Sequence, residues 1–226
     1  GSDVLVRRGA LNLMTSGAGI SHSEYSVGEG EVPLDALQLW VALPETRRHG
    51  SGGFERHEDL PEVRLPAEEG EDAAAVVVMG DFAGARSPAT VHTPIAGVEV
   101  RLAAGSRVRL PLVPEWEYAI LTVEGAASVA DTIVHPHQLL YLGTHREHVE
   151  VTADADTMIF LLGGEPFEAD IVMWWNFVGR SHEEIVEARE EWEAHSSRFG
   201  HVVGHGDERI PAPPLPAVRL TPRRRR

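Results

Sequence analysis

The sequence has 226 residues, enough for one large or two small domains, and its 42% hydrophobic and 24% charged residues are typical of a globular protein. A formal net charge of −15 argues against a general affinity for DNA or RNA, because phosphate binding needs clustered positive charge. No apolar run is long enough to span a bilayer. The absence of cysteine excludes disulfides and thiolate chemistry, makes a reducing cytoplasm the default location, and leaves nitrogen and oxygen as metal donors.

Short strand-like segments dominate the first three quarters of the chain. Residues 37–43 (LQLWVAL) alternate between Pro33 and Pro44, and residues 73–80 form an apolar run. Alternating runs on either side of Gly105 and of Gly125 predict two hairpins. Further strands are predicted at residues 139–143, 148–153 and 157–164. Many short strands separated by glycine indicate an antiparallel β-sandwich or barrel.

Residues 49–72 (HGSGGFERHEDLPEVRLPAEEGED) are polar and rich in glycine and proline, which predicts a linker with a domain boundary near Leu60–Pro66. One strong helix is predicted within residues 181–200. Ser181 and Glu184 form a capping box, Ile185, Ala188 and Trp192 make an apolar stripe, and Gly200 is the expected stop.

The end of the chain is predicted to be extended and partly disordered. Its last eight residues, RLTPRRRR, form the one basic cluster, which we interpret as a disordered end or a cloning remnant rather than an arm that binds polyanions. The aromatic-dense stretch Met173–Phe177 (MWWNF) is interpreted as a buried anchor that packs the C-terminal segment onto the sheets, not as a platform for stacking bases.

The stretch Met14–Ser26 (MTSGAGISHSEYS) contains the candidate metal ligands. On a strand, residues i and i+2 point to the same side, so His22 and Glu24 would converge on one point if that face lines a barrel. An imidazole and a carboxylate suit Fe(II), Mn, Ni, Cu or Zn. Two ligands do not make a site, and the H-x-E spacing alone is weak evidence, because 12 histidines produce such pairs by chance.

Four segments together resemble pirin, a bicupin family of the cupin superfamily. They are residues 9–26, 36–44 (ALQLWVALP), 87–106 and 161–185 (LLGGEPFEADIVMWWNFVGRSHEEI), in the family's order, and the resemblance reaches to about Gly200. It implies an all-β bicupin fold of two antiparallel jelly-roll barrels with a C-terminal helix. The expected parts are the C-terminal part of the first barrel (1–60), the second barrel (61–165), a packing segment with the helix (166–200) and a flexible tail (201–226).

The resemblance implies a metal, usually iron, held in the first barrel by three histidines and one glutamate. His22 matches the third histidine ligand and Glu24 matches the glutamate. The family's other two histidines come from an H-x-H motif that should precede His22, and the chain has none there. We therefore expect the natural protein to be longer, the missing half to lie on another chain, or the gene to be truncated. The initial Gly1-Ser2 is then native sequence rather than a tag scar.

The remaining histidines are interpreted as ordinary loop or surface residues. His135 and His137 (HPH) match the H-x-H letters, but they precede a late strand of the second barrel, which in pirins lacks metal. His145 and His148 should flank a surface turn. Of the others, those at 49 and 57 are placed in the linker, 92 in a loop, and 201 and 205 in the tail.

Two functions stay open at this point. The first is a quercetin 2,3-dioxygenase-like oxidoreductase, whose Fe(II) or other divalent transition metal would need the missing upstream ligands and whose substrate would be a small aromatic molecule such as a flavonol. Glu24 would be a ligand and also a catalytic proton acceptor. The second is a regulatory protein that binds a protein partner with a structural or redox-sensing metal, or a fragment without metal. Neither requires contact with nucleic acid or membrane, and the oligomeric state is left open.

Overall fold

The computed structural model describes residues 1–31 and 36–222. The described chain is mostly β-structure with a single α-helix near its C-terminus, which confirms the predicted all-β class with a C-terminal helix. No helix in this part of the chain is both long and apolar enough to cross a membrane. The chain divides into two compact units. We call Leu5–Leu13 with Glu55–Phe167 the sheet unit, and Gly1–Val4, Met14–Phe54 and Glu168–Arg226 the helix unit.

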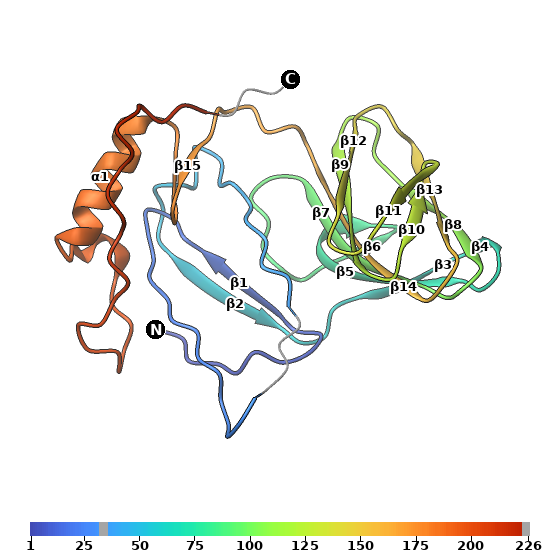
Figure 1. Ribbon diagram of the computed structural model, residues 1–226, viewed down its shortest axis with the longest axis horizontal. Helices are drawn as coiled ribbons and strands as arrows, with labels where there is room; N and C mark the ends of the chain where they lie inside the picture. Colours follow the sequence, from blue (N-terminus) through green and yellow to red (C-terminus); the bar gives the residue numbers. More distant parts are fainter. Residues whose placement is uncertain (32–35, 223–226) are drawn as a thin grey trace. The chain divides into compact units, whose positions relative to one another are not determined.

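The described strands are short, and most of them belong to the sheet unit (Figure 1). They are β1 (Leu11–Thr15), β2 (Gly53–His57), β3 (Glu62–Leu65), β4 (Ala67–Glu69), β5 (Ala73–Phe82), β6 (Ala85–Arg86), β7 (Ile95–Leu102), β8 (Ser106–Pro111), β9 (Glu117–Glu124), β10 (Ala127–Val129), β11 (Thr132–Val134), β12 (Leu139–Gly143), β13 (His148–Ala153), β14 (Thr157–Gly164), β15 (Val172–Trp174) and β16 (Phe177–Gly179). The helices are α1 (His182–Glu193) and the short 3₁₀-helix η1 (Ser197–Phe199).

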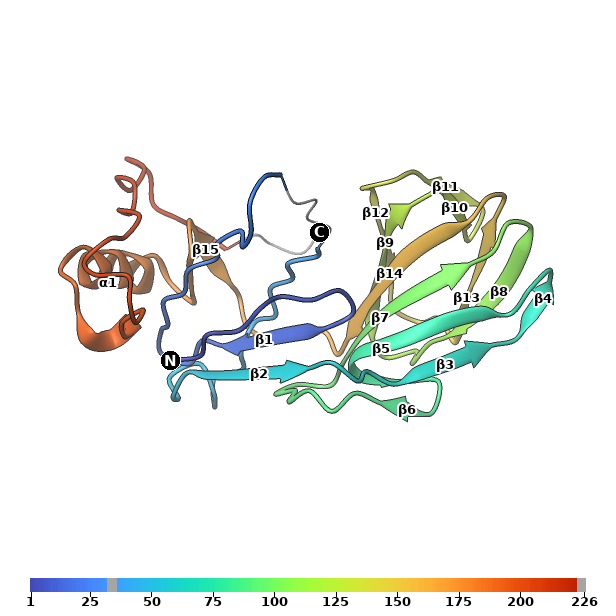
Figure 2. The same cartoon turned by 90° about the horizontal axis from the view of Figure 1, so that it is seen from below.

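The sheet unit consists of two antiparallel sheets around one apolar core (Figure 2). One sheet has the strand order β12-β9-β14-β7-β5-β3, with β6 paired to β5, and the other has the order β11-β10-β13-β8-β4. Alternation places every second side chain inside, as in β13, where Val149 and Val151 are buried. Core residues from both sheets, such as Leu110 of β8 and Ile120 of β9, have no exposed surface. The core therefore lies between the two sheets.

The two hairpins predicted around Gly105 and Gly125 are wrong, although the strands on either side of each glycine are present. Strand β7 pairs with β5 and β14, whereas β8 pairs with β13 and β4, so the chain changes sheets at Gly105. The same change occurs at Gly125, between β9 and β10. Both glycines have a positive φ, +76° and +69°, which allows the sharp turn of a corner between sheets. Glycine thus correctly marks where the chain turns, but it does not determine which strand pairs with the strand that follows the turn.

Two other sequence predictions also differ from the structure. The expected linker at residues 49–72 contains strands β2, β3 and β4. The segment 37–43, expected as a strand, is irregular, and Trp40 in it is 54% exposed. A strand needs a neighbour for its backbone hydrogen bonds, and the described residues supply none here. Pro33, one of the bounds of that predicted strand, and the four final arginines lie outside the described residues.

The helix unit is built around α1 and a small aromatic cluster. Ser181 caps α1 as predicted, since its side chain accepts a hydrogen bond from the Glu184 N–H at 3.2 Å. The helix ends at Glu193, and Gly200 instead ends η1, so the predicted stop is several residues too late. The buried side chains Ile185 and Phe199 belong to the cluster that covers the apolar face of α1.

The MWWNF stretch forms the hairpin β15–β16 and joins the same cluster. Phe177 is buried and Trp175 packs edge-on against it and against Trp192 of α1, with ring centroids 5.2 and 5.9 Å apart. Met173 is 62% exposed and takes no part in the anchor. The stretch is thus an aromatic anchor for the C-terminal helix, and its predicted packing onto the sheets stays a prediction.

The C-terminal residues after Gly200 make contacts that the predicted extended tail does not include. Ala212 is buried, and its N–H donates to the Glu193 carboxylate at 2.8 Å. The Arg189 guanidinium donates to the Pro213 carbonyl at 2.7 Å, and the Trp192 indole N–H donates to the Ile210 carbonyl at 3.0 Å. Contacts with α1 extend from Arg209, which pairs with Glu193, to Leu220, whose N–H donates to His182.

Candidate functional site

His22 and Glu24 lie in an irregular segment that follows strand β1. The segment Ser21–Val27 is not a strand, and both side chains are accessible to solvent. The expected strand geometry, which would point residues i and i+2 to one face, therefore does not hold in this structure. The assignment of the two side chains as metal ligands stays a prediction.

The turn before the H-x-E pair is tightly specified by glycine. Gly17 has φ +51°, and a Cβ there would lie only 2.1 Å from the carbonyl oxygen of Gly50. The Ala18 N–H donates to the same Gly50 oxygen at 2.9 Å, and the Gly19 N–H donates to the Ser16 carbonyl at 3.0 Å. Only glycine at position 17 allows this close approach of two backbones. The Gly-Ser-rich stretch thus forms a fixed entry to the segment.

The described residues do not assemble a complete metal site. In residues 1–31 and 36–222, no three His, Asp or Glu side chains are grouped so that they could hold an ion. Divalent transition metals in proteins normally take at least three protein ligands. A pirin-type metal therefore does not fit the donor set of the described chain, because His22 and Glu24 supply half of it at most.

The H-x-H pair of the second half of the chain is a loop, as interpreted from the sequence. His135 and His137 are exposed and lie between β11 and β12. His137 has φ +64°, and its backbone N–H donates to the Thr122 carbonyl at 2.7 Å. This pair serves the turn between two strands. Similarly, His145 and His148 are exposed on either side of the turn that leads into β13.

Sequence reasoning missed a carboxylate–imidazole pair on strand β2. Glu55 and His57 are i and i+2 on this strand, and their side chains meet with Glu55 Oε2 3.1 Å from His57 Nε2. The Thr90 N–H also donates to Glu55 Oε2, at 3.1 Å. Partial burial raises the pKa of Glu55, but the bonds from His57 and Thr90 outweigh it and hold the pKa below its usual value. The E-x-H letters were visible in the segment interpreted as a linker.

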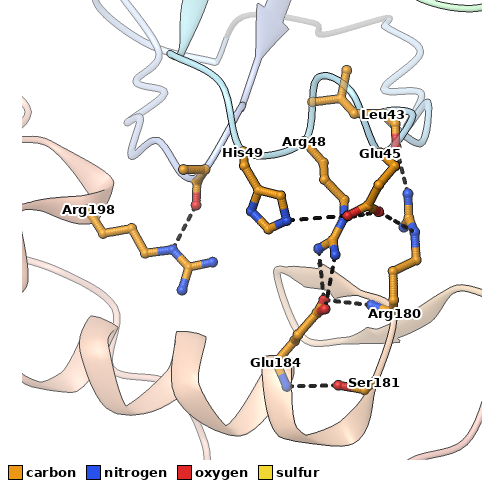
Figure 3. A network of polar contacts seen from close by, with 9 residues as sticks. Leu43, Glu45, Arg48, His49, Arg180, Ser181, Glu184 and Arg198 are labelled. Carbon is orange, nitrogen blue, oxygen red and sulfur yellow. Dashed lines mark hydrogen bonds and ion pairs between the residues drawn. The ribbon is translucent and has the colours of Figure 1, made fainter.

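A network of arginines and glutamates organises the helix unit (Figure 3). The Arg48 guanidinium donates to both Glu184 oxygens, at 2.9 and 3.0 Å, and to Glu45 at 2.5 Å. Glu184 also accepts from the Arg180 N–H at 2.8 Å, and the Arg180 side chain donates to the Leu43 carbonyl at 2.6 Å. The start of α1 is thereby tied to residues 43–48. No local sequence pattern could reveal pairs 136 residues apart.

The pKa shifts in this network follow from the same contacts. Burial raises the pKa of Glu184, but the Arg180 N–H and the Arg48 guanidinium outweigh it and hold the pKa below the ordinary 4.5. The hydrogen bond from Arg48 lowers the pKa of Glu45. Burial lowers the pKa of Arg180, and the nearby positive charge of Arg48 lowers it further. All four groups stay charged at neutral pH, so the network is a set of ion pairs rather than a proton relay.

Comparisons with known proteins agree with the motifs. The family model described as "Pirin C-terminal cupin domain" matches residues 97–200, and the model described as "Pirin" matches residues 1–41. A Pseudomonas aeruginosa protein named "Putative quercetin 2,3-dioxygenase PA1205" is 37% identical over 96% of the chain and 67% of its own length. A Caulobacter vibrioides protein named "Pirin-like protein" is 32% identical over 94% of the chain and 72% of its own length.

A solved structure shares the architecture. The crystal structure titled quercetin 2,3-dioxygenase from Acinetobacter baumannii matches with a TM-score of 0.72 and 35% identity, over 80% of this chain and 59% of that one. The chain thus spans less than two thirds of that relative's length. Two relatives are more than 30% identical and are covered over at least two thirds of their length, and both family models match. The paired antiparallel sheets agree with this relationship. The chain therefore belongs to the pirin family of bicupins.

Proposed function

We propose that this chain is part of a pirin-type quercetin 2,3-dioxygenase, an oxidoreductase that acts on a small aromatic substrate such as a flavonol. The observation that carries the proposal is the 37% identity, over 96% of the chain, to the Pseudomonas aeruginosa protein named "Putative quercetin 2,3-dioxygenase PA1205". We expect the activity in a reducing cytoplasm, an expectation that rests on the absence of cysteine.

In this proposal His22 and Glu24 are two ligands of a divalent transition metal, with Fe(II) as the first candidate. The further ligands must come from outside the described residues, because those residues hold no group of three suitable side chains. When bound, the metal would supply the chemistry by which a flavonol reacts with O₂. Because the described donor set is incomplete, the proposal for this chain's own chemistry is confined to the Glu24 carboxylate, as the acceptor of the flavonol hydroxyl proton.

The test compares this chain with a version extended at its N-terminus by the corresponding residues of the Pseudomonas aeruginosa relative. We expect the extended protein to bind about one metal ion per chain, measured by elemental analysis after purification with Fe(II), and the original chain to bind little. His22→Ala and Glu24→Ala should each remove the metal from the extended protein. Ser26→Ala, which changes an exposed side chain of the same segment, is the matched control.

Oxygen uptake with quercetin then tests the activity itself. We expect uptake by the metal-loaded extended protein and a loss of uptake with either ligand variant. A metal-loaded protein that consumes no oxygen would defeat the enzyme proposal and favour the second candidate, a regulatory protein that binds a protein partner. Tight, stoichiometric metal in the original chain that survives His22→Ala would instead contradict the ligand assignment.

A further inference from the structure

The short helix η1 contacts the segment that contains His22 and Glu24. Both belong to the helix unit, although they are almost 180 residues apart in the sequence. Two hydrogen bonds and one ring contact join η1 to residues just before His22, and one hydrogen bond joins the tail to the residue just after Glu24. The candidate ligands are thus flanked by contacts on both sides.

Arg198 connects the H-x-E segment to helix α1. Its Nε donates to the Ala18 carbonyl oxygen at 2.7 Å, and its Nη1 donates to Glu191 of α1 at 2.6 Å. Figure 3 shows the Arg198 side chain extended toward this backbone oxygen. The side chains of Arg198 and Glu191 are 30% and 36% exposed, so the pair is partly shielded from water. A planar guanidinium held at both of these nitrogens has little freedom to turn.

Phe199 and Ser21 form the second contact. The Ser21 hydroxyl donates to the Phe199 carbonyl at 2.9 Å. The Phe199 ring lies so close to Gly19 that a Cβ on that glycine would be 2.9 Å from the ring. Phe199 is itself 8% exposed and packs edge-on against Trp192 with centroids 5.3 Å apart. The backbone before His22 therefore rests on a buried ring that is fixed by the helix.

The contact beyond the pair involves Tyr25 and His205. The Tyr25 hydroxyl and His205 Nδ1 are 2.7 Å apart and hydrogen-bonded, and the two rings lie with centroids 5.7 Å apart. Tyr25 directly follows Glu24 in the sequence. His22 and Glu24 themselves remain exposed to solvent between these contacts. The flanking residues are thus held in place while the two candidate ligands are free of packing contacts that would bury them.

We propose that η1 is a positioning element for the H-x-E segment, with Ser21 and Arg198 as its positioning residues. The ordering of the segment follows from the contacts alone. The consequence that this ordering presents two metal ligands rests on the proposed function. The side chains of Ser21 and Arg198 are not of types that ordinarily bind a transition metal. Their role is therefore to hold the backbone of the segment that carries His22 and Glu24.

Amide hydrogen exchange in the unextended, metal-free chain tests the proposal. The readout is the exchange of the Ala18 and Gly19 amides, which are hydrogen-bonded to Gly50 and Ser16. We expect Ser21→Ala and Arg198→Ala each to speed their exchange about fivefold, since each removes one hydrogen bond that holds the segment closed. Ser21→Thr keeps the hydroxyl and should restore slow exchange. Ser26→Ala is the matched control and should have no effect.

The amides of strands β8 and β13 in the sheet unit serve as an internal reference, because they should not change in any of these variants. Unchanged exchange at Ala18 and Gly19 in both alanine variants would overturn the proposal. So would equally fast exchange in Ser21→Thr and Ser21→Ala, or a rise of the same size in β8 and β13. Because the exchange is measured without metal, its result does not depend on whether the protein is a dioxygenase. Likewise, unchanged exchange rates would leave the dioxygenase proposal untouched.

Discussion

The two units of the molecule are stabilised in different ways. In the sheet unit, large side chains such as Leu110, Ile120 and Leu161 are completely buried between the sheets. The helix unit has a smaller apolar cluster on α1, and none of the described residues in 14–54 is buried. Hydrogen bonds and ion pairs join this part of the chain to α1 and η1. Apolar burial of this kind contributes more than partly exposed ion pairs. Thus the candidate ligands belong to the region with the smaller reserve of stability.

The largest effect should come from the sheet unit. Leu110→Ala removes a side chain with no exposed surface and leaves a cavity, so we expect a loss of about 2–5 kcal/mol in the free energy of unfolding. Denaturant unfolding followed by circular dichroism measures it. The matched control is Leu139→Ala, since Leu139 is 56% exposed and should cost less than about 1 kcal/mol. Equal losses in the two variants would contradict the burial described for the sheet unit.

A smaller effect should come from the Arg48–Glu184 pair of the helix unit. The side chains are 18% and 34% exposed, so we expect a coupling of about 1 kcal/mol in a double-mutant cycle of Arg48→Ala and Glu184→Ala. Hydrogen exchange of the α1 amides provides the measurement. Arg86 and Asp81 make a similar two-bonded pair at 78% and 54% exposure, and solvent screening should make their coupling clearly weaker. A coupling for Arg48–Glu184 no larger than that of the exposed pair would show that burial adds nothing to it.

The smallest effect is the pH dependence of the same network. Because the pKa of Glu184 is lowered in the folded state, its contribution is present above the ordinary value of 4.5 and is lost as the pH falls through the lower, folded value. Glu45 has a lowered pKa and contributes with the same sign, whereas Arg48 and Arg180 stay charged. The thermal unfolding temperatures of the wild type and Glu184→Gln should therefore converge as the pH falls below 4.5 and through the lower, folded pKa of Glu184. Parallel curves over that range would argue against the ion pair.

Sequence patterns predicted the last three strands of the sheet unit well. Strands β12, β13 and β14 begin and end at the predicted residues, because alternating apolar residues bounded by turns specify a strand without reference to its partner. The strand pairing could not be predicted in the same way. The glycine turns at Gly105 and Gly125 are equally compatible with a hairpin and with a corner between sheets, and only the whole set of strands decides between them.

The candidate site was less accessible to prediction. His22 and Glu24 were predicted as ligands from their motif, and that assignment stays a prediction. The strand geometry expected for them depends on neighbours that the described residues do not provide. The contacts of Arg198 with Ala18 and of Arg48 with Glu184 involve side chains far apart in the sequence and have no local signature. The E-x-H spacing of Glu55 and His57 can be read from the sequence. The pair was missed because glycine and proline around β2 indicated a linker.

The corners at Gly105 and Gly125 have a consequence for how fast the protein can fold. Because the chain leaves one sheet for the other at these glycines, its strands find partners far along the sequence, with Ile95 opposite Gly164 and Ser106 opposite Ala153. Each such pairing must close a long loop before its contacts stabilise it, which places sandwiches of this type among the slow folders, in milliseconds to seconds. Newly made chains of this protein therefore expose their apolar strands longer than a helical protein of the same length would.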